Sequence, residues 1–178
     1  FFNTFLFSFG GTTKDISTMV AASAVVAVVT TFVMGTLSDK LGRRKIFICA
    51  GYVAWGITVM AFAFISRENL GKLIGADPSS AAALSATVTT VIVMDCIMTF
   101  MGSTSNDSAF NAWITDVTVP SNRAKTEGLL AILPVLALVI VTGVFGFIAG
   151  DDAQASDYST CFLGLGILVI ICGIIGIF

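Results

Sequence analysis

The stretch GTLSDKLGRRK, Gly35–Lys45, lies between two long segments that carry no charge. Before it, 23 uncharged residues separate Asp15 from Asp39, and after it 21 uncharged residues separate Lys45 from Arg67. About 20 apolar residues are enough for a helix to cross the hydrocarbon core of a bilayer. The stretch therefore predicts a tight turn between two membrane-spanning helices.

The same spacing of charges recurs in the second half of the chain. Another 23 uncharged residues lie between Glu127 and Asp151, and 21 follow Asp157. These segments are predicted to be helices, because only a helix satisfies every backbone polar group within one lipid-exposed segment. The alternating strands of about 10 residues that are typical of a membrane β-barrel are not visible.

The composition supports a membrane protein and excludes other classes. Apolar residues make up 56% of the 178 residues and charged residues only 11%, and the mean hydropathy is +0.98. Soluble domains are about a quarter charged, and disordered chains are poor in apolar residues. A net charge of −2 and a pI near 4.8 disfavour a nucleic-acid partner.

We therefore predict an all-α integral membrane protein whose first partner is the lipid bilayer. The first nine residues, FFNTFLFSF, are apolar but too short to span a membrane, and they have no initiator Met. We therefore expect them to be the end of a truncated helix. The chain would then be one transmembrane domain, 1–178, that is cut at both ends. Its helices are expected at about 1–10 (partial), 16–38, 46–66, 83–116, 122–149 and 158–178.

Basic residues are concentrated on one side of the predicted membrane helices. That side carries six of them: Lys40, Arg43, Arg44, Lys45, Arg123 and Lys125. The other side carries three bases and six acids: Lys14, Arg67, Lys72, Asp15, Glu68, Asp77, Asp151, Asp152 and Asp157. The positive-inside rule then places loops 39–45 and 116–127 in the cytoplasm. We expect a multi-pass protein of a plasma or inner membrane.

The stretch Gly35–Lys45 resembles the signature loop of the major facilitator superfamily, G-x-L-(S/A)-D-x-x-G-R-(R/K)-(R/K), at every fixed position. The resemblance implies the amino-terminal six-helix half of that fold, built as two inverted three-helix repeats. It also implies that the missing carboxy-terminal half is a partner. In the family, this loop carries a charge network that links the two halves and stabilises the outward-open state. By resemblance, the cytoplasmic latch consists of Gly35, Asp39, Gly42, Arg43 and Arg44.

A second stretch, WITDVTVPSNRAKTEG, resembles the junction between helices 4 and 5 of the same family. The matching residues are Asp116, Pro120, Arg123 and Gly128. Arg123 and Glu127 are four residues apart on the predicted helix 122–149 and can pair there. We expect a charge network of Asp116, Arg123 and Glu127, in which Arg123 reaches Asp39 or Asp116. The alternative is a solvated loop with incidental charges.

The predicted helix 83–116 contains the polar side chains that a solute or an ion would need. At 100° per residue, six of them lie on one half of the helix: Asp95, Thr99, Ser103, Asn106, Asp107 and Asn111. Polar groups that face lipid are costly, so this half must face protein or water. We expect Asp95, near the midplane, to be a site for a coupling ion, a proton or a solute. Asp107, Asn106 and Asn111 would line the inner part of a cavity or join the latch. The alternative for Asp95 is a protonated or hydrogen-bonded carboxyl packed between helices.

These features predict a secondary active transporter rather than an enzyme. It would move a small solute by alternating access, coupled to a proton or a sodium ion. The alternative is a transporter-like membrane sensor or scaffold without solute flux. No metal and no cofactor are expected, because the sequence has no histidine, no CxxC spacing and no GxxxxGK(S/T) loop.

Overall fold

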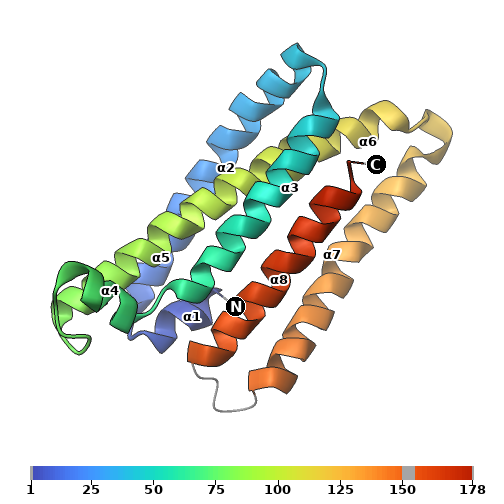
Figure 1. Cartoon of the computed structure of the whole chain (residues 1–178). Coiled ribbons are helices and arrows are strands. Elements are labelled where there is room, and N and C mark those ends of the chain that lie inside the picture. Colours follow the sequence, from blue (N-terminus) through green and yellow to red (C-terminus); the bar gives the residue numbers. More distant parts are fainter. Residues whose placement is uncertain (1, 150–154, 178) are drawn as a thin grey trace.

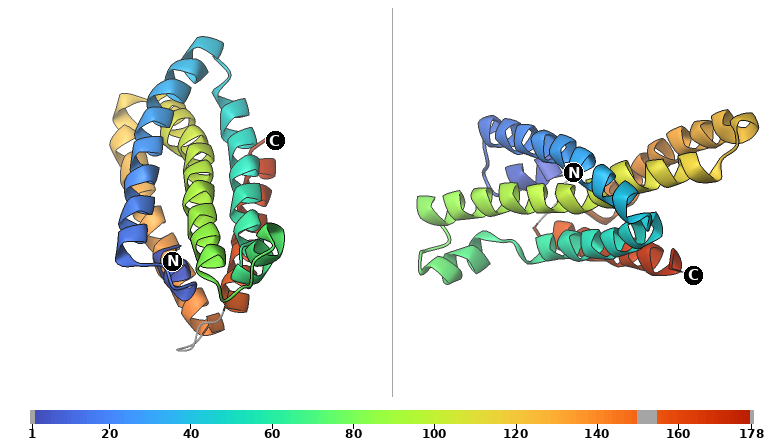
Figure 2. Two further views of the ribbon diagram at one scale, coloured as in Figure 1. Left: turned by 90° about the vertical axis from the view of Figure 1, so that its left-hand side faces the viewer. Right: turned by 90° about the horizontal axis from the view of Figure 1, so that it is seen from above.

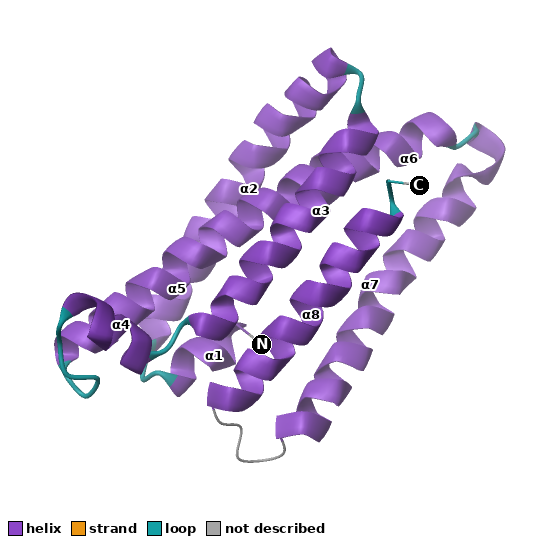
Figure 3. Ribbon diagram, viewed as in Figure 1, coloured by secondary structure: helices purple, strands orange, loops and turns teal. Residues whose placement is uncertain are grey.

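The structure, a computed structural model, describes residues 2–149 and 155–177, and every regular element in these ranges is a helix. Five helical segments are long and apolar enough to cross a membrane. They are built on α2 (Thr13–Leu41), α3 (Arg44–Ala61), α5 (Ala81–Gly102), α7 (Pro120–Ala149) and α8 (Ala155–Ile175) (Figure 1; Figure 3). The fold is therefore the all-α membrane fold that the sequence predicts.

Two of the spanning segments contain turns of a different geometry. The end of α3 continues into a 3₁₀ turn, η1 (Phe62–Phe64). The end of α5 continues into a π-helix, η2 (Ser103–Phe110), and then into α6 (Asn111–Val117). Residues 81–117 thus form one continuous rod, where the sequence predicts a single long helix over 83–116.

Two short helices lie at one end of the bundle, α1 (Phe2–Ser8) and α4 (Arg67–Ile74) (Figure 1). The sequence predicts helices over 46–66 and 83–116 and none over the residues of α4. Its start is fixed by Ser66, whose Oγ accepts a hydrogen bond from the backbone N–H of Asn69 at 3.1 Å. Such a cap satisfies one of the free N–H groups at a helix start, which favours a helix even in a short polar segment.

The stretch Gly35–Lys45 forms the tight turn that its sequence predicts. Gly42 has a φ of 60°, a left-handed conformation that glycine adopts at little cost. Its N–H donates a hydrogen bond to the carbonyl oxygen of Ser38 at 3.0 Å, which ends α2. Because α3 begins at Arg44, only two residues separate the two helices.

Glycines allow α3 and α8 to pack against each other along their length (Figure 1). A Cβ atom placed on Gly56 would lie 2.5 Å from Cγ1 of Ile170 and 2.7 Å from the carbonyl oxygen of Gly166. A Cβ atom on Gly166 would lie 2.3 Å from Cγ of Met60. Real Cβ contacts are not this short, so the observed approach requires glycine at both positions.

The remaining long helices are arranged around this pair. Seen from above, α2, α5 and the α3–α8 pair follow one another in that order (Figure 2), and α5 contacts both α2 and α3. The side chains of α7 over 120–147 are exposed or half-buried within the chain, and this helix contacts α8 only sparsely. The bundle therefore consists of α2, α3, α5 and α8, with α7 at its edge.

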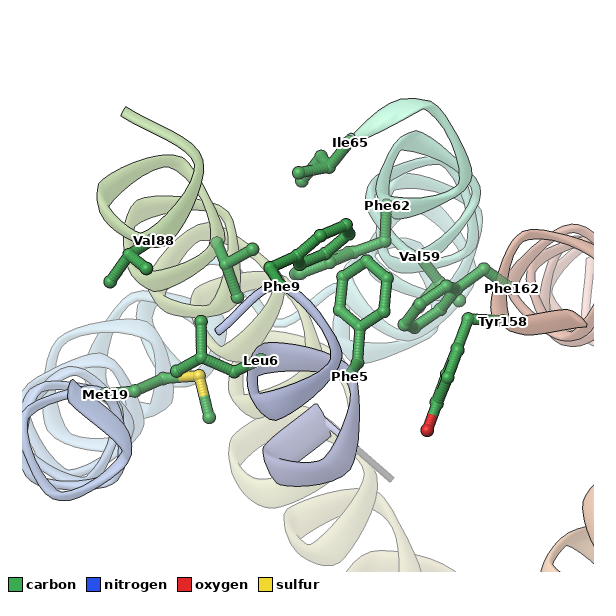
Figure 4. Close-up of a cluster of buried hydrophobic side chains, with 11 residues drawn as sticks. Phe5, Leu6, Phe9, Met19, Val59, Phe62, Ile65, Val88, Tyr158 and Phe162 are labelled. Atoms are coloured by element: carbon green, nitrogen blue, oxygen red, sulfur yellow. The ribbon is translucent and has the colours of Figure 1, made fainter. Parts of the chain in front are cut away.

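The apolar core lies at the end of the bundle where α1 enters it (Figure 4). Phe5 packs edge-to-face on Phe162 of α8, with ring centroids 4.9 Å apart, and contacts Tyr158 at 5.5 Å. Leu6 points towards Met19 of α2 and is fully buried. Residues 2–9 thus join α2, α5 and α8 at this end.

Candidate functional site

The turns that carry the predicted basic loops lie at one end of the bundle, opposite α1 and α4 (Figure 1). We call this the basic end. It is defined by the turn between α2 and α3, the turn between α6 and α7, and the helix ends that flank them. Its basic residues are Lys40, Arg43, Arg44, Lys45, Arg123 and Lys125. Among the acids predicted for the opposite side, Asp151 and Asp152 lie outside the described residues.

Arg44 joins two carboxylates at the basic end. Its Nη2 lies 2.9 Å from Oδ1 of Asp39, and its Nε lies 3.2 Å from Oδ2 of Asp116. The side chain of Arg44 is 23% exposed, whereas the two carboxylates are 60% and 55% exposed. A planar guanidinium has several donors in fixed directions and can hold both acids at once. This group of three residues, which we call the Arg44 clamp, connects α2, α3 and α6.

The clamp borders an open pocket of about 410 Å³. The other lining residues are Gly42, Arg43, Lys45 and Trp113. A Cβ atom on Gly35 would lie 3.8 Å from Cβ of Ser108, so α2 passes close to the π-helix just before the clamp. The structure therefore brings together Gly35, Asp39, Gly42, Arg43, Arg44 and Asp116, as a group, at the basic end.

The predicted partnership of Arg123 with Asp39 or Asp116 is wrong. Arg123 instead donates from Nη2 to the carbonyl oxygen of Thr115 at 2.9 Å and from Nε to Oγ1 of Thr118 at 3.3 Å. A cation at the end of a helix is stabilised by the free carbonyl groups there. Arg123 lies in the first turn of α7 and reaches back to the last turn of α6, and Arg44 takes the place predicted for it.

Glu127 does not join the charge network either. Over residues 2–149 and 155–177, no ion pair forms between Glu127 and Arg123 or any other base. The i, i+4 spacing permits such a pair, but Arg123 is turned back towards α6. Helix surface pairs of this kind contribute only about 0.2–0.5 kcal/mol, less than the hydrogen bonds that a charged group makes to backbone carbonyls.

The six polar side chains predicted to share one half of helix 83–116 do not line one cavity. A π-helix makes i→i+5 hydrogen bonds, so each of its residues turns the chain less than in an α-helix. Side chains beyond Ser103 are consequently rotated away from the positions that 100° per residue gives. Asn111 is exposed, and its amide donates to the backbone carbonyl of Asp107 at 3.1 Å.

Asp95 faces α2 and is separate from the other polar residues. Its side chain is buried, with the residue 7% exposed, and its Oδ2 accepts a hydrogen bond from Oγ of Ser23. Ser23 belongs to α2, 72 residues earlier in the chain. The two residues form a polar pair between α2 and α5. A buried carboxyl without a hydrogen-bond partner would be costly in a membrane-spanning segment, and Ser23 supplies that partner.

Four of the six polar residues line a pocket between α3 and the α5–η2 rod. This polar pocket has a volume of about 190 Å³ and is lined by Trp55, Met98, Thr99, Gly102, Ser103, Asn106 and Asp107. The hydroxyl of Tyr52 donates to Oδ1 of Asn106 at 3.0 Å. The Oγ of Ser103 donates to Oδ2 of Asp107 at 2.7 Å. These bonds fix the directions of the amide and the carboxylate.

Sequence reasoning missed Ser23 and Tyr52 as members of these groups. Each has apolar residues or glycine on both sides in the sequence, which is a weak signal. A serine in such a position can bond to its own helix backbone, and a tyrosine can lie at a membrane interface. Their roles depend on which helix lies opposite, and this information is not local in the sequence.

In the described part of the chain, no group of three or more His, Cys, Asp or Glu side chains is placed to hold a metal ion. The four cysteines, Cys49, Cys96, Cys161 and Cys172, are free thiols in different environments. The basic end therefore offers guanidinium, ammonium and carboxylate groups, whereas the polar pocket offers a carboxylate, hydroxyls, an amide, a thioether and an indole.

The chain was also compared with known proteins. A family model described as Major Facilitator Superfamily matches residues 1–178. Neither the comparison with curated proteins nor that with solved structures gave a match.

Proposed function

Because the chain belongs to the major facilitator superfamily and is a multi-pass membrane transporter, we propose that it moves a small solute by alternating access, driven by a proton or sodium gradient. In this proposal, the described helices form the amino-terminal half of a longer transporter. The basic end faces the cytoplasm, and the missing carboxy-terminal half completes the solute path.

The observation that carries the proposal is the Arg44 clamp. A gate that opens and closes in every cycle must be held by bonds that are weak enough to break. Partly exposed ion pairs contribute about 0.2–1 kcal/mol each. Arg44 makes two such pairs, with Asp39 at 2.9 Å and Asp116 at 3.2 Å. Together the two pairs hold three helix ends in one arrangement. The free energy needed to break them is small enough for a transport cycle to supply.

Asp95 is the residue that we assign to coupling. It is a buried carboxyl in a membrane-spanning segment, and it accepts a hydrogen bond from the neutral hydroxyl of Ser23 on a neighbouring helix. An ionised carboxyl is costly at such a position unless an ion or a proton neutralises it. Binding and release of that cation would therefore change the contact between α2 and α5, which is how a gradient would act on the helix arrangement.

Reconstitution of the full-length protein into proteoliposomes tests the proposal. A panel of radiolabelled cations, anions, sugars and amino acids is offered under an imposed pH or sodium gradient. Gradient-driven accumulation of at least one of them supports transport. If none enters faster than into protein-free vesicles, the protein is a sensor or scaffold with a transporter fold, and the proposal is wrong.

A further inference from the structure

We propose that the polar pocket between α3 and the α5–η2 rod binds a small organic cation, such as a protonated amine or a quaternary ammonium group. This inference rests on the proposed function, since it names the class of solute that the transporter would carry. It assigns Asp107 as the anionic group of the site and Trp55 as its aromatic wall. The class of solute is inferred from the polar pocket alone, not from the turn motifs or the Arg44 clamp.

The charge of the pocket is the first argument. Its lining includes one carboxylate, that of Asp107, and no basic side chain. The carboxylate accepts hydrogen bonds from neutral donors, Ser103 at 2.7 Å and Asn106 at 3.3 Å. No ion pair involving Asp107 occurs among the residues that the structure describes. The pocket therefore favours a cation and opposes an anion.

The aromatic wall is the second argument. Trp55 lines the same pocket, and its indole is packed so closely on α5 that a Cβ atom on Gly102 would lie 3.2 Å from Cε2. Tyr52 lies beside it, with ring centroids 5.7 Å apart. The face of an indole attracts ammonium and guanidinium groups more strongly than other aromatic faces do. A tryptophan and a carboxylate in one small pocket are thus suited to an organic cation.

The size of the pocket is the third argument. About 190 Å³ is less than the 300–1,000 Å³ of common ligand pockets. It holds a small head group rather than a whole large solute. The thioether of Met98 and the indole supply apolar surface, which suits methyl or methylene groups around a charged nitrogen better than the ring of hydroxyls on a sugar.

Equilibrium binding of radiolabelled tetramethylammonium to the full-length protein tests the inference. We expect saturable binding that tert-butanol, a neutral molecule of similar size, does not displace. Asp107→Asn should weaken binding about tenfold, because it removes the one charge of the pocket. Trp55→Leu should weaken it about fivefold, whereas Trp55→Phe, which keeps an aromatic face, should retain most of the affinity. Asp77→Asn, which removes a charge from a distant exposed loop, is the matched control.

Equal binding to the Asp107→Asn variant and the unchanged protein, or equal displacement by tert-butanol, would overturn the inference. The proposed function has a separate readout. If the proteoliposomes accumulate only solutes that are not cations, and Asp107→Asn leaves that uptake unchanged, the proposed transport is supported and the proposed cation site is wrong. If no solute is transported but tetramethylammonium binds in an Asp107-dependent manner, the proposed cation site is supported and the proposed transport is wrong.

Discussion

Nε of Arg44 lies 3.2 Å from Oδ2 of Asp116, although 72 residues separate them in the sequence. The contact joins the first residue of α3 to the last turn of α6, and the same guanidinium holds Asp39 of α2. Three helix ends are therefore connected through one side chain, so loss of Arg44 should release all three, whereas loss of either carboxylate should release only the helix that carries it.

We expect Arg44→Gln to loosen the basic end more than Asp116→Asn does, because it removes the ion pair with Asp39 as well as the one with Asp116. The double variant should add nothing to Arg44→Gln, since the contact that Asp116→Asn removes is already lost. Spin labels on cysteines that replace the exposed Leu41 and Val119 report the distance across this end in the full-length protein. Each single variant should broaden the distance distribution. Lys125→Gln, which also removes a basic charge at this end, should not. Additive effects of the two substitutions would show that Arg44 and Asp116 act independently.

Asp95→Asn should uncouple transport from the gradient. With one proton per solute and the membrane potential held at zero, one pH unit supports an accumulation of at most about tenfold. The variant should reach a ratio near one, while exchange of labelled for unlabelled solute continues. Ser23→Ala removes only the hydroxyl that bonds to Asp95, so it should retain accumulation. Normal accumulation by the Asp95→Asn variant would remove this residue from the coupling mechanism.

Gly56→Ala and Gly166→Ala should each lower the thermal unfolding midpoint of the full-length protein in detergent. The added Cβ atoms would lie 2.5 Å from Ile170 and 2.3 Å from Met60, and relief of such clashes costs roughly 1–3 kcal/mol. Gly164→Ala on the same helix is the control, since nothing lies within 4 Å of its Cβ position. That substitution should leave the midpoint unchanged or raise it through the helix propensity of alanine. Similar midpoints for all three variants would contradict close α3–α8 packing.

Much of the fold could be predicted from the distribution of charges. Long uncharged runs determine which helices cross the membrane, and Gly42 determines how α2 ends. Both features could be predicted because they depend on local sequence. The π-helix over 103–110 could not be predicted, since its residues, STSNDSAF, favour no particular hydrogen-bonding pattern. Its geometry is accompanied by close contact with α3, where a Cβ atom on Gly51 would lie 2.7 Å from Cβ of Ser105.

The candidate sites depend on pairs of helices and were predictable only in part. Asp39, Arg44 and Asp116 could be named from their motifs, but the choice of Arg44 over Arg123 as the bridging base could not. Both arginines follow a helix end closely, and the decision depends on which carbonyl groups and carboxylates each one reaches. The separation of Asp95 from Asp107 likewise depends on the neighbours of α5.

In the proposed transport cycle, the Arg44 clamp closes the basic end of a solute path. The most direct measurement uses a full-length protein without native cysteines that carries Thr99→Cys in the polar pocket, in membrane vesicles of both orientations. We predict that Arg44→Gln speeds labelling of this cysteine by a membrane-impermeant thiol reagent from the basic end and slows it from the other side. Lys40→Gln, the control in the same turn, should change neither rate. If Arg44→Gln leaves both rates unchanged, the clamp is not a gate and the account is wrong.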